Sequence, residues 1–249
     1  MEILDYMQRN GHEQLLVCHE ASAGLRAFIA IHDTTLGPAC GGVRMWPHVS
    51  EEEGLKDVLR LAKAMTYKSA VAGLPLGGGK ALILADPRKD KNEGLLRAFG
   101  RFVDTLGGRY LTTEDVGMTP ADLEHIAQET DHVLGLPLSK GGSGDTSEFT
   151  GLGLYLGIKA SAKAVWGSDS LEGRVVAIQG FGHVGTQLAI HLQKEQAKLV
   201  VTDIYEEELE RARAIGATIV KPDAVYDTEC DVFSPCALGG VLNGRTIGA

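Results

Sequence analysis

The chain of 249 residues has no long apolar run. Its longest apolar stretches, such as residues 81–85 and 175–178, are far shorter than the ~20 residues that a membrane-spanning helix requires. The amino terminus carries Glu2 and Asp5, which a secretory leader does not tolerate. We therefore expect a cytoplasmic protein with no membrane partner.

Positive charge is also scarce, because 24 Lys and Arg residues stand against 33 Asp and Glu residues and the net charge is −9. Nucleic-acid binding is driven by Lys and Arg displacing counterions from phosphates, so we exclude nucleic acid as a partner. Hydrophobic residues make up 44% of the chain and charged residues 23%, which is ordinary for a globular protein and argues against disorder. The length favours two domains.

Cysteine is rare and shows no metal-binding pattern. The four cysteines are Cys18, Cys40, Cys230 and Cys236. They form no CxxC pair and no zinc-type spacing with any of the eight histidines. We expect reduced thiols and no metal site.

The first half of the chain alternates between strand and helix patterns. Residues 14–20 and 25–33 are two β-rich runs joined by a four-residue turn, which predicts a hairpin. Residues 81–85 resemble a short buried strand, and residues 110–112 look extended. The alternation predicts an α/β domain over residues 1–138.

Capping residues mark the helices of this domain. Ser50 and the glutamate three residues later form a capping box before a helix that carries Lys68 near its carboxyl end. Asn92 is placed to open a second helix, and Thr119 is placed to cap a third.

The second half carries the pattern of a dinucleotide-binding domain. A strand pattern at residues 175–178 leads into a GxGxxG motif, followed by a helix pattern at 183–194 and a strand pattern at 199–201. The motif consists of Gly180, Phe181, Gly182, His183, Val184 and Gly185. Its first glycine permits a tight turn, its second lets a pyrophosphate approach, and its third permits close helix–strand packing. We predict a Rossmann-type domain over residues 139–249, after a glycine-rich hinge at 141–147.

Asp203 stands 23 residues after Gly180, at the end of the second strand pattern. Its carboxylate would accept hydrogen bonds from the adenosine ribose and repel a 2′-phosphate, so the sequence favours NAD over NADP. A second glycine-rich run, residues 77–80, ends in Lys80 and could suggest the phosphate-binding loop of an NTPase. We exclude an NTPase, because its motif needs a glycine where Leu74 stands and a hydroxyl side chain where Ala81 stands.

Lys68 and Lys80 are twelve residues apart, about a hundred residues before the glycine motif. Any one lysine is usually a solvated surface charge. Two ammonium groups held close together each raise the electrostatic cost of the other, so one can serve as a base near neutral pH while the other holds a carboxylate. We expect both to be shielded from bulk solvent.

Several ordered segments resemble the amino-acid dehydrogenase family (Glu/Leu/Phe/Val dehydrogenases), with the leucine dehydrogenase branch the nearest. The resemblance runs from the amino terminus to Asn243 and is carried by residues 37–46, 65–68, 77–80, 86–92, 114–117 and 234–239. It implies that the first domain binds substrate and mediates assembly into a homo-oligomer, possibly an octamer. It also implies that the second domain binds NAD and that the reaction occurs in the cleft between the two.

The resemblance also implies roles for individual residues. Lys68 would hold the substrate α-carboxylate together with backbone N–H groups around Gly41 and Gly42. Lys80, its pKa lowered by Lys68 and by burial, would activate the water that attacks an iminium intermediate, and Asp115 would exchange protons with the amino group. The other implied substrate-binding residues are Met65, Cys40 and Thr113. The other implied cofactor-binding residues are Thr150, Cys236 and Ala237.

The implied activity is the reversible, NAD-dependent oxidative deamination of leucine, valine or isoleucine to the 2-oxo acid and ammonia. Cys40 and Thr113 are smaller or more polar than the aliphatic residues expected around leucine. One methylene is worth only ~1–3 kcal/mol in such a site, so a phenylalanine-type dehydrogenase stays open. The family continues through a further carboxyl-terminal segment, so the Rossmann domain is expected to be incomplete, with four or five of its usual six strands. A catalytically impaired NAD-binding or assembly subunit is the remaining alternative.

Overall fold

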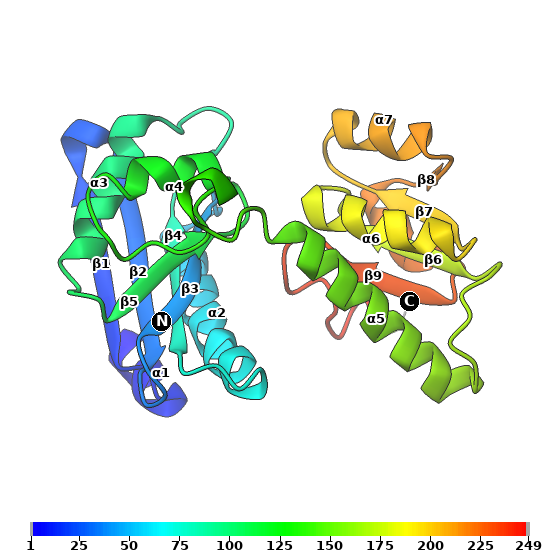
Figure 1. Cartoon of the computed structure of the whole chain (residues 1–249), viewed down its shortest axis with the longest axis horizontal. Coiled ribbons are helices and arrows are strands. Elements are labelled where there is room, and N and C mark those ends of the chain that lie inside the picture. The colour runs from blue at the N-terminus through cyan, green and yellow to red at the C-terminus, as the bar shows by residue number, and fades with distance from the viewer. Residues whose placement is uncertain (1, 248–249) are drawn as a thin grey trace. The chain divides into compact units, whose positions relative to one another are not determined.

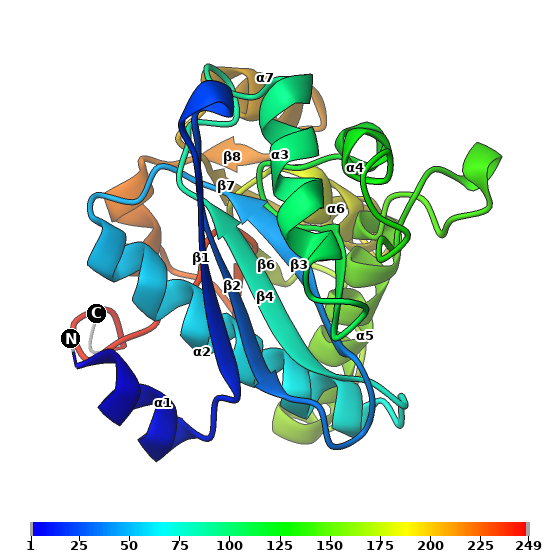
Figure 2. The ribbon, with the colours of Figure 1, turned by 90° about the vertical axis from the view of Figure 1, so that its left-hand side faces the viewer.

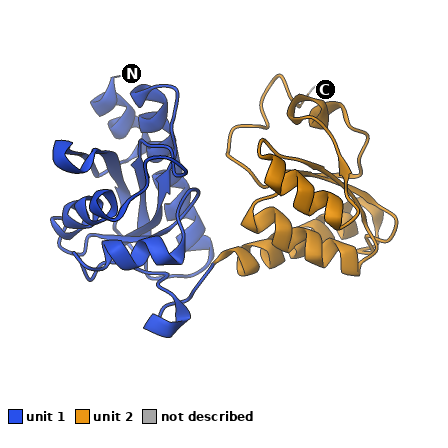
Figure 3. Cartoon of the chain, turned by 90° about the horizontal axis from the view of Figure 1, so that it is seen from above, with its two compact units in different colours: residues 1–145 blue, residues 146–249 orange. Residues whose placement is uncertain are grey.

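The computed structural model describes residues 2–247 and divides the chain into two compact units, Met1–Asp145 and Thr146–Ala249 (Figure 3). The division falls inside the predicted glycine-rich hinge at 141–147 and seven residues beyond the predicted domain end at 138, since 145 − 138 = 7. None of the described helices is long and apolar enough to cross a membrane.

Within the described residues, the first unit is built on a five-stranded sheet with the order β1-β2-β4-β3-β5 (Figure 1). The strands are β1 (Gln14–Glu20), β2 (Leu25–Asp33), β3 (Ala39–Met45), β4 (Gly77–Ile83) and β5 (Tyr110–Glu114). The predicted hairpin is confirmed, because β1 and β2 pair antiparallel and a short 3-10 turn, η1 (Ala21–Ala23), joins them. β4 is antiparallel to β2, whereas β3 is parallel to both β4 and β5.

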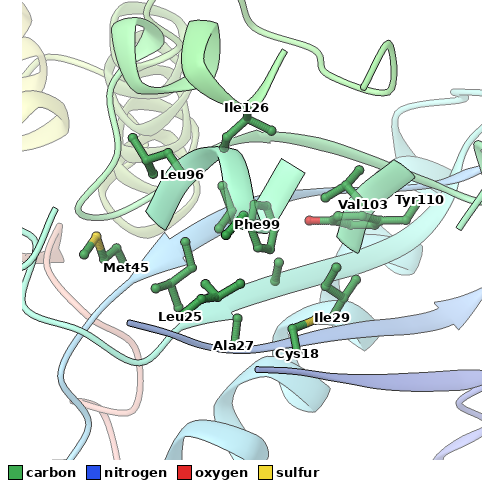
Figure 4. Packing of buried hydrophobic residues seen from close by; sticks show 14 of the residues in the cluster. Cys18, Leu25, Ala27, Ile29, Met45, Leu96, Phe99, Val103, Tyr110 and Ile126 are labelled. Carbon is green, nitrogen blue, oxygen red and sulfur yellow. The ribbon is translucent and has the colours of Figure 1, made fainter. Parts of the chain in front are cut away.

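Helices cover both faces of this sheet (Figure 2). They are α1 (Ile3–Asn10), α2 (Glu51–Val71), α3 (Glu93–Asp104) and α4 (Pro120–Ile126). On one face, Phe99 of α3 and Ile126 of α4 pack over Ala27 and Ile29 of β2 (Figure 4). On the other face, α2 packs on β4 and β2. Each face of the sheet therefore carries its own apolar core.

The predicted helix caps are present in the structure, and of the capping box predicted at Ser50 the structure shows the half that the serine hydroxyl makes. The Ser50 hydroxyl accepts a hydrogen bond from the backbone N–H of Glu53 at 3.2 Å, and the Asn92 side chain accepts one from Leu95 at 3.0 Å. Thr119 forms a reciprocal capping box with the aspartate at the third helical position. These local bonds fix where α2, α3 and α4 begin.

The strand predicted at residues 81–85 differs from the structure, because β4 begins four residues earlier and includes three glycines. A Cβ at Gly77 would lie 2.0 Å from the carbonyl oxygen of Asp33, and one at Gly78 would lie 2.2 Å from the backbone nitrogen of Thr66. Glycine weakens an isolated strand, but here it allows β2 and α2 to approach the β4 backbone directly.

The described part of the second unit contains a four-stranded, all-parallel sheet with the order β8-β7-β6-β9. Its elements are α5 (Ser147–Trp166), β6 (Val175–Gln179), α6 (His183–Lys194), β7 (Lys198–Thr202), α7 (Glu206–Ala214), β8 (Thr218–Ile219) and β9 (Val232–Pro235). Short 3-10 turns are η2 (Leu138–Lys140), in the first unit, and η3 (Pro222–Asp227), in the second. A parallel sheet with β6 inside and the glycine turn at its carboxyl end is the predicted Rossmann-type arrangement.

Candidate active site

The predicted substrate-side residues gather on one face of the first sheet. In β4, Ala81 and Ile83 belong to the core under α3, so the alternation of side chains places Lys80 on the opposite face, the one that α2 covers. The same alternation along β3 and β5 places further residues on this face: Cys40, Gly42, Arg44 and Thr113, with Asp115 directly after β5. Parallel pairing of the three strands thus brings together residues that are distant in sequence.

Lys80, which is buried, and Asp115, which is half-buried, form a largely buried ion pair. The distance from Lys80 Nζ to Asp115 Oδ1 is 3.0 Å, and Lys80 is only 5% exposed. Burial disfavours a charged ammonium and is the main reason that the pKa of Lys80 lies below its ordinary value. The Asp115 carboxylate opposes this lowering of the pKa, whereas Arg44 and, more weakly, Lys68 add to it.

Arg44 is a site residue that the sequence predictions missed. Its Nε donates to Asp115 Oδ2 at 2.8 Å, and its Nη1 donates to Asp57 Oδ2 in α2, also at 2.8 Å. Burial raises the pKa of Asp115, but the nearby cations Lys80 and Arg44 outweigh burial and hold this pKa below its ordinary value. The sequence predictions included no strand at residues 39–45, and it is the pairing of β3 with β4 and β5 that places Arg44 beside Asp115.

The prediction that both lysines are shielded from solvent is wrong for Lys68. Lys68 lies in the last turn of α2 and is exposed, while Lys80 is buried. The reason is geometric, because the face of α2 that meets the sheet at this end carries Thr66 and Ser69 instead. An exposed ammonium keeps its charge in water and remains available to a carboxylate.

Gly41 and Gly42 are required by the packing of the strands themselves. A Cβ at Gly41 would lie 1.8 Å from the carbonyl oxygen of Gly79, and a Cβ at Gly42 would lie 2.3 Å from that of Glu114. The carbonyl oxygen of Gly41 accepts a hydrogen bond from the Tyr110 hydroxyl at 2.6 Å. These contacts account for both glycines without a ligand, and their role in binding a substrate carboxylate stays a prediction.

Cys40 and Thr113 are half-buried on the part of the face that α2 leaves uncovered, since α2 packs mainly on β4 and β2. Burial raises the pKa of Cys40, and the nearby Lys80 only partly opposes this. Cys40 is therefore a neutral thiol at physiological pH and contributes shape and weak polarity.

The glycine turn of the second unit has the features that a dinucleotide needs. Gly180 has φ of +95°, a conformation that favours glycine, and a Cβ at Gly185 would lie 2.2 Å from the carbonyl oxygen of Gly180. A Cβ at Gly182 would meet no heavy atom of the described residues within 4 Å, so the turn is open at this point. Gly182 is the N-cap of α6 and offers no side chain to the first-turn N–H groups, which leaves a helix end suited to pyrophosphate.

Asp203 follows β7 and holds this turn in place. Its Oδ2 accepts a hydrogen bond from the backbone N–H of Phe181 at 2.6 Å, and its Oδ1 accepts one from that of Tyr205 at 2.9 Å. The Phe181 ring is buried in the core of the unit, whereas His183 is exposed and Val184 is half-buried. Within the motif, the Phe181 side chain therefore belongs to the core, and the turn is open at Gly182.

The remaining predicted cofactor residues lie near the same turn or on α5. A Cβ at Gly180 would lie 2.7 Å from Cβ of Ala237, and the backbone N–H of Cys236 donates to the carbonyl oxygen of Gln179 at 2.7 Å. Burial raises the pKa of Cys236, so it is a packed thiol. Thr150 is exposed in the first turn of α5 and donates to the carbonyl oxygen of Thr146 at 2.9 Å.

Comparison with known proteins gives matches in both units. Residues 12–132 match the family model described as "Glu/Leu/Phe/Val dehydrogenase, dimerisation domain", and residues 141–205 match "Glutamate/Leucine/Phenylalanine/Valine dehydrogenase". A leucine dehydrogenase of Geobacillus stearothermophilus is 57% identical over 99% of this chain and 68% of its own length. A phenylalanine dehydrogenase of Lysinibacillus sphaericus is 49% identical over 95% of this chain and 64% of its own.

Solved structures agree with these matches. The crystal structure of L-tryptophan dehydrogenase from Nostoc punctiforme is 47% identical in sequence, has a TM-score of 0.65, and is matched over 99% of this chain and 70% of its own. The motifs, the two folds and the identities agree: this chain belongs to the Glu/Leu/Phe/Val dehydrogenase family of amino-acid dehydrogenases.

Proposed function

We propose that the protein catalyses the reversible, NAD-dependent oxidative deamination of leucine, valine or isoleucine to the 2-oxo acid and ammonia. The observation that carries this proposal is the buried pair of Lys80 and Asp115, whose atoms lie 3.0 Å apart on the sheet face that also carries Cys40 and Thr113. The relatives named leucine dehydrogenase, at 57% and 55% identity, support the branched-chain substrate.

The substrate is proposed to bind through its α-carboxylate to Lys68. The exposed position of Lys68 in the last turn of α2 suits a charged anchor for a ligand that arrives from solvent. Met65, one turn earlier on the same helix, and the half-buried Cys40 and Thr113 would then surround the substrate side chain. In this arrangement the amino group is directed to Lys80 and Asp115.

Proton transfer is assigned to the buried pair. NAD held at the glycine turn of the second unit would supply the acceptor for the hydride of the substrate Cα. Lys80 in its neutral form takes a proton from the water that attacks the substrate iminium carbon, and its lowered pKa makes that form more accessible. Asp115 in its ionised form takes a proton from the substrate ammonium and returns one to the departing ammonia. The net reaction consumes one water and one NAD and releases the 2-oxo acid, ammonium, NADH and one proton.

The second unit is proposed to bind NAD through the open turn at Gly182 and the first turn of α6. Each oxygen of Asp203 accepts one backbone N–H and retains a further lone pair for the adenosine ribose hydroxyls. The same negative charge disfavours a 2′-phosphate, which supports NAD over NADP.

Aromatic amino acids form a second candidate substrate class. Relatives named L-tryptophan dehydrogenase and phenylalanine dehydrogenase are both 49% identical to this chain. Neither Cys40 nor Thr113 is bulky, so no large side chain at these two positions closes the face to an aromatic ring.

The proposed reaction is tested by absorbance at 340 nm in alkaline buffer. The purified chain is incubated with NAD or NADP and with each of leucine, valine, isoleucine, phenylalanine and tryptophan. Formation of NADH with the branched-chain substrates, at kcat/KM values above those for the aromatic ones, is the expected result. No NADH with any of the five refutes the proposed reaction, and calorimetric titration with NAD then shows whether a cofactor-binding subunit remains.

Self-association is proposed from the same family membership. The first unit matches a domain described as a dimerisation domain, and homo-oligomers up to an octamer are expected. Mass photometry at nanomolar concentration that gives only a mass near 26.5 kDa, the mass of one chain, contradicts this expectation.

A further inference from the structure

Arg44 stands at the centre of a line of charged and titratable side chains that begins at Lys80 and Asp115. Lys80 contacts Asp115 at 3.0 Å, Arg44 contacts both Asp115 and Asp57 at 2.8 Å, and His48 Nε2 lies 3.4 Å from Asp57 Oδ2. The five side chains come from β4, the end of β5, β3, α2 and the loop before α2. Arg44 is 7% exposed and is thus the buried junction of this line.

The guanidinium fixes how the Asp115 carboxylate is oriented. Nε of Arg44 bonds Oδ2 of Asp115, which leaves Oδ1 for Lys80. Nη1 of the same planar group bonds Asp57, so Arg44 itself is held from a second direction. A lysine at this position has a single nitrogen and could not hold both carboxylates in this fixed geometry.

The charge of Arg44 also bears on the proton of Lys80. If Lys80 faced Asp115 alone, their attraction would favour the ammonium form. Arg44 engages the same carboxylate and repels a second positive charge beside it. The charged and titratable groups near this pair are Asp115, Arg44, Lys68, Cys40 and Tyr110, with Asp57 and His48 behind Arg44.

We propose that Arg44, anchored by Asp57, is a positioning residue that orients Asp115 toward Lys80 and supplies the positive charge that helps Lys80 to release its proton. This inference rests on the proposed function for its role in catalysis, whereas its electrostatic part concerns the protein without ligands. It assigns to Arg44 the repelling role that the sequence predictions gave to Lys68. The lowered pKa of Lys80, in which Arg44 acts more strongly than Lys68, agrees with this assignment.

The electrostatic part is tested by NMR titration of the protein labelled with 13C at the lysine Cε, with the Lys80 signal assigned through Lys80→Arg. In Arg44→Gln, the titration midpoint of Lys80 is expected to rise by about one pH unit. Arg44→Lys keeps the charge and is expected to leave the midpoint near that of the wild type. Arg26→Gln is the matched control, because Arg26 is an exposed arginine of β2 that pairs with Glu51 at the surface. An unchanged midpoint in folded Arg44→Gln overturns the proposal.

The positioning part is tested by steady-state kinetics over pH. Arg44→Gln should shift the acidic limb of the plot of kcat against pH to higher pH, by the same amount as the NMR midpoint. A merely structural defect would instead lower kcat equally at every pH. Arg44→Lys should lower kcat at least tenfold with little movement of that limb.

Asp57→Asn is the alternative test variant if Arg44→Gln does not fold. It retains the arginine and removes only its anchor, so kcat should fall while the Lys80 midpoint stays near that of the wild type. Wild-type kcat in Asp57→Asn overturns the positioning role. If the wild type shows no activity but Arg44→Gln still moves the Lys80 midpoint, the proposed function has failed and the electrostatic inference stands.

Discussion

Nδ1 of His32 in β2 lies 2.8 Å from the hydroxyl oxygen of Thr66 in α2, within hydrogen-bonding distance. A Cβ at Gly78 in β4 would lie 2.1 Å from the same oxygen. The carboxyl-terminal turns of α2 therefore contact two neighbouring strands. Thr66 makes a polar contact with His32 of β2, and the missing side chain of Gly78 lets α2 approach the β4 backbone closely. Met65 and Lys68 stand on either side of this attachment point and are placed by it.

Gly78→Ala is expected to destabilise the first unit by about 1–3 kcal/mol or more, because the added methyl must displace the backbone of α2 at Thr66. Urea unfolding followed by circular dichroism measures the loss. The matched control is Gly153→Ala inside α5, where a Cβ meets no heavy atom of the described residues within 4 Å and alanine should stabilise the helix by about 0.5–1 kcal/mol. Equal effects of the two substitutions would contradict the packing argument.

Substitution by alanine should affect NAD binding at one glycine of the nucleotide turn and stability at another. Gly182→Ala is expected to leave the melting temperature unchanged and to weaken NAD binding, because its Cβ points into the space where pyrophosphate is proposed to bind. Gly185→Ala should lower the stability of the second unit, since its Cβ would lie 2.2 Å from the carbonyl oxygen of Gly180. Calorimetric titration with NAD and thermal unfolding of both variants give the comparison, and unaltered NAD affinity in Gly182→Ala would refute the proposed binding mode.

Substitution of Lys80 or Asp115 should lower kcat, and the two variants should differ in their effect on the stability of the fold. Lys80→Met and Asp115→Asn are each expected to reduce kcat by about 10²–10⁴-fold, the usual contribution of general acid–base catalysis. Asp115→Asn should in addition destabilise the fold by about 3–5 kcal/mol, because it leaves two buried cations without their shared carboxylate. Lys56→Met, at an exposed position of α2, is the control and should retain wild-type kcat. A kcat within threefold of wild type for Lys80→Met would remove Lys80 from the mechanism.

Asp115 should also contribute to stability against acid. Its pKa in the folded protein lies below the ordinary value of 3.8, so below pH 3.8 the unfolded chain binds the proton more readily. The contribution of this group is therefore fully present above pH 3.8 and is lost as the pH falls through the lower pKa of the folded state. The slope of unfolding free energy against pH should be smaller in Asp115→Asn than in the wild type between pH 4 and 2, and identical slopes would show that Asp115 has an ordinary pKa.

Elements with local signals could be predicted from the sequence to within a residue or two. The cap at Asn92, the hairpin turn after β1 and the glycine motif before α6 are all determined by neighbours along the chain, and each lies where it was predicted. The start of β4 was missed, because glycine disfavours a strand locally and only the approach of Thr66 and Asp33 from distant segments explains it.

The site was predictable in its residue types but not in its electrostatics. The motifs indicated Lys80 and Asp115, which the structure brings into contact. The identity of the second cation could not be predicted in this way, because it depends on the pairing of β3 with β4 and β5, which puts Arg44 closer to the pair than Lys68. Exposure of Lys68 likewise depends on how α2 lies on the sheet.

The floor beneath the proposed substrate includes main chain, because Gly42 and Gly78 on this face of the sheet leave no room for a methyl group. Its contour is therefore the same whatever amino acid the enzyme accepts. A mutational library intended to alter substrate preference should be confined to the side chains that rise from this floor or overhang it, at Cys40, Thr113 and Met65, and randomising the glycines would yield mainly misfolded protein.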